Sequence, residues 1–176
     1  MKKILVCLLL AVLVFTGCAE KVEHVDDVSH ELMGNRAITI PDETSALAKA
    51  IYEATDYTVN YAVENKLGKK PEFISFYFSS DILLSSAEKD TLISLFSCYD
   101  VEITEGLRSD LEDIQRGITV GFDSIDQRQT SDCDLTIPIN IYWGNDYYTY
   151  CCDFKSVKGE YVLFRFEFLH RVKYMN

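Results

Sequence analysis

The chain has 176 residues, a length that allows one domain with its own hydrophobic core. Its 28 acidic residues outnumber its 17 basic residues, which gives a net charge of −11 with neutral histidines. Such an excess of negative charge repels the phosphate backbone of nucleic acids and the headgroups of anionic lipids, so we expect no nucleic-acid partner.

The chain begins with the composition of an export signal. Lys2 and Lys3 give a positive start, and an uninterrupted apolar run, Ile4–Phe15, follows them. A helix needs roughly 20 apolar residues to span a bilayer, so this run is too short for that and indicates a signal peptide. Its removal as residues 1–17 would take away two lysines and leave a net charge of −13.

The end of this run resembles the lipobox of bacterial lipoproteins. The sequence there is Phe15-Thr16-Gly17-Cys18, with a small residue directly before the cysteine. The resemblance implies that the Cys18 thiol is acylated and that cleavage occurs between Gly17 and Cys18. The acyl chains would then hold the protein on the extracytoplasmic face of the cell membrane, or on the outer membrane of a Gram-negative bacterium. An ordinary secretory signal with an incidental cysteine is the alternative.

A spacer is predicted between the anchor and the folded part. Residues 19–35 carry many charges and show little periodicity. We therefore expect residues 18–36 to comprise the lipidated cysteine and a flexible spacer, and residues 37–172 to form a single domain.

The first half of the domain combines predicted helices and strands. Apolar residues at helical spacing predict a helix over Glu43–Lys66, with Asp42 as its N-cap and Gly68 as its stop. Ser85 and Glu88 have the spacing of a capping box and predict the start of a second helix. The other expectations are a strand at Phe73–Phe78, burial of Leu92, Ile93 and Phe96 in the second helix, a strand at Val101–Thr104 and a short helix at Ser109–Gln115.

The second half contains a predicted β-hairpin with Gly144-Asn145 as its turn. Closing the hairpin there brings apolar residues opposite apolar residues, and a slip by one residue would destroy the agreement. The predicted pairs are Trp143 with Asp146, Ile141 with Tyr148, Ile139 with Tyr150, Ile137 with Cys152 and Leu135 with Phe154.

Two more strands complete the predicted sheet. A three-residue loop, Val157-Lys158-Gly159, leads to a strand that extends to the end of the domain, and Ile118–Ile125 adds another strand with a bulge at Gly121. The loop would pair Phe154 with Val162, Cys152 with Phe164, Tyr150 with Phe166 and Tyr148 with Phe168. The prediction is an α+β domain, with N-terminal helices on one face of an antiparallel meander sheet of about four strands. This element order resembles NTF2-like and cystatin-like folds, although a fold does not fix a function.

Thiol chemistry would have to use the domain's only histidine, His170, and one of four cysteines. An even number of cysteines permits two disulfides in an exported chain. The predicted register separates Cys133 from Cys152 by about 13 Å, so these two are not expected to pair, whereas a bridge from Cys98 to either of them stays open. Cys152 would lie about 20 Å from His170, and Cys151 would point to the other face, so neither is expected to form a dyad with the histidine. This geometry does not exclude Cys98 or Cys133, but nothing in the sequence favours them.

Metal binding has weak support in the sequence. Four aspartates crowd one predicted turn, namely Asp123, Asp126, Asp132 and Asp134. Carboxylates suit Ca²⁺, but the spacing differs from that of an EF-hand loop, and a solvated acidic turn is the preferred interpretation. No metal site and no cofactor is predicted.

The aromatic residues Tyr142, Tyr147, Tyr148 and Tyr150, beside Trp143, have two interpretations. They line a ligand or protein-contact surface, or they belong to the sheet core, which is the preferred interpretation for Tyr148 and Tyr150. A flat face that exposes Tyr142 and Leu163 would favour protein contact, and a deep pocket with a polar base would favour catalysis.

The leading functional hypothesis is a membrane-anchored, non-enzymatic lipoprotein of the cell envelope that binds a protein or a small ligand. One alternative is an NTF2-like envelope enzyme with carboxylates in the concavity of the sheet. Another is an immunity or inhibitor protein whose acidity complements a basic target.

Overall fold

The computed structural model describes residues 40–79, 84–106, 115–122 and 133–173 of the chain. Several predictions fall outside these ranges. They are the signal peptide, the lipidated Cys18 with cleavage after Gly17, the spacer, most of the short helix at Ser109–Gln115, and the aspartates Asp123, Asp126 and Asp132.

The fold is α+β, with a six-stranded mixed sheet in the order β2-β1-β3-β4-β5-β6. The antiparallel meander is present as β3 to β6, and β1 extends it by pairing in parallel with both β3 and β2. The expected sheet of about four strands was therefore too small, because parallel partners are joined by long connections that leave no local signal. The strands are β1 Phe73–Phe78, β2 Glu102–Glu105, β3 Ile118–Phe122, β4 Leu135–Trp143, β5 Asp146–Val157 and β6 Glu160–Lys173.

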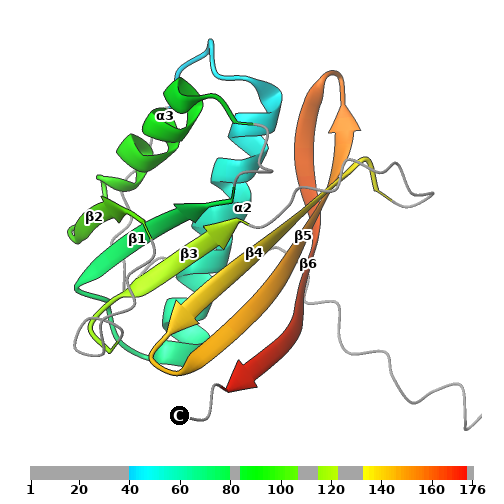
Figure 1. Ribbon diagram of the computed structural model, residues 1–176. Helices are drawn as coiled ribbons and strands as arrows, with labels where there is room; N and C mark the ends of the chain where they lie inside the picture. The colour runs from blue at the N-terminus through cyan, green and yellow to red at the C-terminus, as the bar shows by residue number, and fades with distance from the viewer. Residues whose placement is uncertain (1–39, 80–83, 107–114, 123–132, 174–176) are drawn as a thin grey trace, which may run out of the picture.

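Both described α-helices, α2 (Ala46–Ala62) and α3 (Ser86–Phe96), lie on the same face of this sheet (Figure 1). Helix α2 packs across β4, β5 and β6, and α3 packs beside β2. We call the opposite face, toward the viewer in Figure 1, the outer face. The apolar core fills the space between the sheet and the helices.

Helix α2 begins later than predicted. Ser45 is its N-cap, since its hydroxyl oxygen accepts a hydrogen bond from the Ala48 amide at 3.2 Å, so the assignment of Asp42 was wrong. The Ser45 hydroxyl also donates to the Glu88 carboxylate at 2.6 Å, which ties the starts of α2 and α3 together. A π-helical turn, η1 (Val63–Leu67), continues α2 and ends at Gly68 with φ 65°, as predicted for the stop.

The capping box of α3 is confirmed. The Ser85 hydroxyl oxygen accepts from the Glu88 amide at 3.3 Å, and the Glu88 carboxylate accepts from the Ser85 amide at 3.0 Å. Leu92 and Phe96 are buried, and Ile93 is half-buried.

The β4–β5 hairpin has the predicted register at every predicted pair, from Trp143 with Asp146 to Leu135 with Phe154. Ile139, Tyr150 and Cys152 on its helix-facing side have no solvent exposure. The Thr58 hydroxyl of α2 lies 3.6 Å from the Cys152 thiol, which shows how closely the helix approaches this face.

The turn between β5 and β6 differs from the prediction. Its loop has two residues, Lys158 and Gly159, with φ 55° and 91°, so Val157 pairs with Glu160. Two positive φ values are typical of the tight hairpin turn whose twist matches the strands. The sequence did not indicate it because lysine rarely adopts a positive φ.

The register of β6 shifts twice along its length, between Asp153 and Phe154 and between Thr149 and Tyr150. The predicted β5–β6 pairs were therefore wrong. The observed partners are Phe154 with Leu163, Cys152 with Phe166, Tyr150 with Phe168, Thr149 with His170 and Tyr148 with Arg171. As a consequence Leu163, whose exposure would have favoured protein contact, is buried, and Val162 is 47% exposed instead.

Gly121 is not a bulge, because it pairs in register with Asn140 of β4 and with Tyr77 of β1. A β-carbon at this position would lie 2.9 Å from the Tyr142 ring. Glycine is therefore the residue that lets the Tyr142 ring lie close to the outer face of β3.

Candidate functional site

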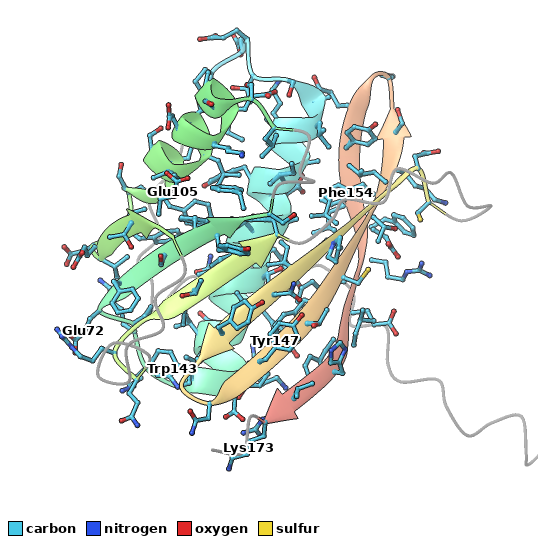
Figure 2. The ribbon with its side chains drawn as sticks, in the orientation of Figure 1. Glu72, Glu105, Trp143, Tyr147, Phe154 and Lys173 are labelled. Atoms are coloured by element: carbon cyan, nitrogen blue, oxygen red, sulfur yellow. The ribbon has the colours of Figure 1, made fainter. Side chains whose placement is uncertain are left out.

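The predicted tyrosine cluster divides between the two faces of the sheet. Tyr148 and Tyr150 point to the helices and are buried, as preferred from the sequence. Tyr142 and Tyr147 lie opposite each other on the outer face, half-buried, with ring centroids 4.8 Å apart. Figure 2 shows Tyr147 on the side of the sheet away from the helices. The outer-face pair is the part of the cluster available for contact with a partner.

Asn140 organises the residues beside this pair. Its side-chain oxygen accepts a hydrogen bond from the Tyr147 hydroxyl at 2.8 Å and another from the Thr149 hydroxyl at 3.0 Å. Asn140 is only 2% exposed and Thr149 only 7% exposed. Hydrogen bonds between buried groups hold side chains in one arrangement, so Tyr147 is fixed before any partner arrives.

His170 joins the same group from β6. Its Nε2 lies 3.3 Å from the Thr149 hydroxyl oxygen, and its ring centroid lies 5.9 Å from that of Tyr147. Because the single Thr149 hydroxyl proton is donated to Asn140, Nε2 must donate to Thr149. In the neutral ring this leaves Nδ1 as an acceptor for a ligand, and in the charged ring Nδ1 becomes a donor. We call Asn140, Tyr142, Tyr147, Thr149 and His170 the outer-face cluster.

This geometry is suited to binding and unsuited to nucleophilic catalysis. A hydroxyl nucleophile must give its proton to a base, as serine does to histidine in hydrolases. Here the Thr149 proton points to a carboxamide oxygen, and His170 acts as a donor toward the same hydroxyl. The cluster can therefore offer ring surfaces and hydrogen-bonding groups to a partner, without an activated nucleophile.

A second polar group lies farther along the outer face, around Asp153. This residue is 5% exposed, and its carboxylate accepts from Arg165 Nε at 2.6 Å and from the Thr136 hydroxyl at 2.7 Å. The Cys133 thiol lies 3.3 Å from the Thr136 hydroxyl, and the Cys151 thiol lies 3.9 Å from the Asp153 carboxylate. The hydrogen bond that Arg165 donates to Asp153 raises the pKa of Arg165, so the guanidinium stays charged beside this carboxylate.

The thiols of Cys151 and Cys152 are held in their protonated form. Burial, reinforced by the Asp153 charge, raises the pKa of Cys151 to about 12, and burial likewise raises the pKa of Cys152. Cys98, Cys133, Cys151 and Cys152 form no disulfide with one another in the structure, so neither of the bridges from Cys98 that the sequence left open is present.

The prediction that Cys151 and His170 lie on different faces was wrong. The register shift between Thr149 and Tyr150 places His170 opposite Thr149, so the histidine shares the outer face with Cys151. Cys152 lies on the helix-facing side, away from His170. The His170 Nε2 is engaged by Thr149 and the Cys151 thiol lies beside Asp153, so neither thiol forms a dyad with the imidazole.

Metal binding is also limited by internal contacts. Asp134, the described member of the aspartate turn, accepts a hydrogen bond from the Ser156 amide at 2.8 Å. Across residues 40–79, 84–106, 115–122 and 133–173, no group of three or more His, Cys, Asp or Glu side chains could hold a metal ion.

An open depression of about 450 Å³ lies between the end of α3 and the start of β2. Its lining comprises Glu72 and residues 97–102. Glu72 pairs with Arg116 and Asp100 pairs with Lys70, so both of these lining carboxylates have cationic partners. The depression is open to solvent, whereas ligand pockets are usually enclosed clefts.

No protein-family model, curated protein or solved structure matches the chain at a significant level. In the part of the chain that the structure describes, no helix is both long and apolar enough to cross a membrane.

The sequence indicated Tyr142 and Tyr147 as candidates but missed Asn140, Thr149 and His170 as their partners. Asn140 and Thr149 could have been found from the sequence, because both are polar residues on the alternate face of the predicted hairpin. His170 had no such signal, since its position depends on the irregular pairing of β6.

The Asp153–Arg165 pair should contribute to stability rather than to function. Arg165→Met keeps the length of the side chain but leaves a buried carboxylate without its cation, and we expect unfolding free energy to fall by about 2 kcal/mol. Arg116→Met, which removes the partner of the exposed Glu72, should leave the midpoint of urea denaturation unchanged. Equal effects of the two substitutions would contradict this assignment.

Proposed function

We propose that the chain is a lipid-anchored protein of the bacterial cell envelope and that its domain is a non-enzymatic module that binds a protein partner through the outer-face cluster. Within the α+β class, an NTF2-like or cystatin-like arrangement is part of the proposal and rests on element order alone.

The anchor is supported by the N-terminal sequence. Lys2, Lys3 and the short apolar run have the composition of an export signal, and Gly17-Cys18 closes the run as in a lipobox. Each acyl methylene buried in a membrane contributes about 0.8 kcal/mol, so two or more acyl chains on Cys18 would anchor the domain stably.

The binding role is supported above all by the two hydrogen bonds that Asn140 accepts. They fix Tyr147 and Thr149 in place, so little side-chain freedom is lost when a partner docks. Tyrosine rings provide large contact areas at low entropic cost and are enriched at the centres of protein interfaces. The half-buried rings of Tyr142 and Tyr147, placed side by side, match this pattern.

The non-enzymatic part of the proposal is supported by where the reactive protons lie. The Thr149 proton is donated to an amide, the thiols of Cys151 and Cys152 have raised pKa values, and Asp153 is neutralised by Arg165. An enzyme of the predicted alternative type would need a carboxylate free to exchange a proton. The strand carboxylate most buried among the described residues, Asp153, is engaged instead.

The anchor can be tested by substitution of two cysteines in the first 18 residues. In a bacterial host fed an alkyne fatty acid, the wild type should be labelled and should partition into detergent. Cys18→Ser should abolish the label, because the acylated thiol is lost. Cys7→Ser, a matched change inside the signal peptide, should have no effect. Labelling that persists in Cys18→Ser would contradict acylation at this residue.

The binding surface can be tested by site-specific photo-crosslinking in cells that contain the anchored protein. Benzoylphenylalanine at Tyr147 should give a discrete adduct, whereas the same group at Val157, which is 50% exposed at the far turn, should not. Once the adduct is identified, Tyr142→Ala should weaken its binding to the purified protein at least about tenfold, and Val157→Ala should leave it unchanged. Equal adducts at both positions would count against a dedicated outer-face site.

A further inference from the structure

Positive charge gathers at one end of this acidic molecule. The turn of the β4–β5 hairpin, the end of η1 and the end of β6 meet there, as Figure 2 shows with Trp143 and Lys173. Residues 63–69, 143–146 and 171–173 carry four cations, Lys66, Lys69, Arg171 and Lys173, against the two carboxylates Glu64 and Asp146. We call this region the hairpin end.

The cations of the hairpin end lie over aromatic rings. The Lys69 ammonium is 5.1 Å from the Trp143 ring centroid, and the Lys66 ammonium is 5.0 Å from that of Phe168. The Arg171 guanidinium lies 5.4 Å from the Tyr148 ring while it pairs with Asp146. A lysine or arginine placed over a ring keeps its charged group in water, while its aliphatic part lies on an apolar surface. Basic and aromatic side chains at a membrane interface are arranged in the same way.

Exposed apolar residues extend the same region. Leu169 is 48% exposed and Val172 is 41% exposed, both near the end of β6. Leu169 has no partner in the β5–β6 register, because it falls where the register shifts. Apolar side chains between cations add contact with acyl chains to attraction by headgroups.

The net charge of the whole chain does not prevent attraction at this end. Electrostatic interactions in solution are screened over about 8 Å at physiological ionic strength. Helix α2 and η1 together are about 33 Å long at 1.5 Å per residue, and they separate the hairpin end from the acidic residues near Glu43 and Glu88. The local excess of cations therefore determines the sign of the force on this end.

We propose that the hairpin end docks on anionic lipid headgroups and thereby orients the anchored domain on the membrane. The inference rests on the proposed anchor at Cys18. The chain between Cys18 and the first described residue, Ile40, is long enough, because 21 intervening residues can extend to about 70 Å. Docking by this end leaves the Asp153 end of the outer face directed away from the lipid.

Trp143 is the single tryptophan of the chain and lies in the proposed contact, so its fluorescence reports docking directly. The acylated protein is inserted into vesicles of brominated phosphatidylcholine, with or without phosphatidylglycerol. We expect quenching and a blue shift of Trp143 emission only in the vesicles that contain phosphatidylglycerol, and reversal of both at high salt. Equal emission in the two vesicle types would overturn the proposal.

Matched charge removal completes the test. The double substitution Lys66→Gln with Lys173→Gln should lower the ratio of docked to undocked protein by about 25-fold. Each cation near an anionic surface contributes a factor of about five to this ratio, and the two factors multiply. Lys155→Gln with Lys158→Gln removes the same charge from the opposite end of the sheet and should leave the ratio unchanged. Equal losses in the two variants would overturn the proposal in favour of a non-local charge effect.

Vesicle flotation separates this inference from the anchor. A protein that floats with both vesicle types but shows no lipid-dependent quenching has the anchor and lacks the docking surface. A protein that fails to float with neutral vesicles lacks the anchor, whatever its fluorescence in anionic vesicles.

Discussion

The pairing of β4 with β5 is the interaction on which the rest of this structure depends. Side chains alternate between the two faces of a strand, so one register determines the composition of both faces. It places Ile139, Tyr150 and Cys152 beneath α2, and it sends Asn140 and Thr149 to the outer face as direct neighbours. The apolar core and the candidate binding surface are therefore two consequences of the same set of backbone hydrogen bonds, and a slip by one residue would destroy both.

Strand β6 adds the parts that the hairpin alone cannot supply. Without the register shift between Thr149 and Tyr150, His170 would lie opposite Tyr148 on the helix-facing side. The shift moves it to the outer face, where its Nε2 reaches the Thr149 hydroxyl, and it brings Arg171 over the Tyr148 ring. Irregular pairing of this kind re-aims side chains and is common beside functional surfaces. Here one irregularity shapes both the outer-face cluster and the hairpin end.

Features that depend on nearby residues could be predicted from the sequence. The Gly144-Asn145 turn, the Ser85 capping box and the stop at Gly68 each follow from residues close along the chain. Features that depend on residues far apart along the chain could not be predicted in this way. Nothing local indicates that β1 pairs in parallel with two strands, or that Lys158 adopts a positive φ. The tyrosines of the candidate site were visible in the sequence, but their faces and partners required the register of the complete sheet.

Nuclear Overhauser effects across the last three strands test the central claim most directly, because they report which residues face each other in solution. The account predicts contacts of Cys152 with Ile137 on one side and with Phe166 on the other, together with contacts between Thr149 and His170. Contacts of Cys152 with Phe164, or of His170 with Tyr148, in place of these would show that β6 has another register and would contradict the assignment of the outer-face cluster.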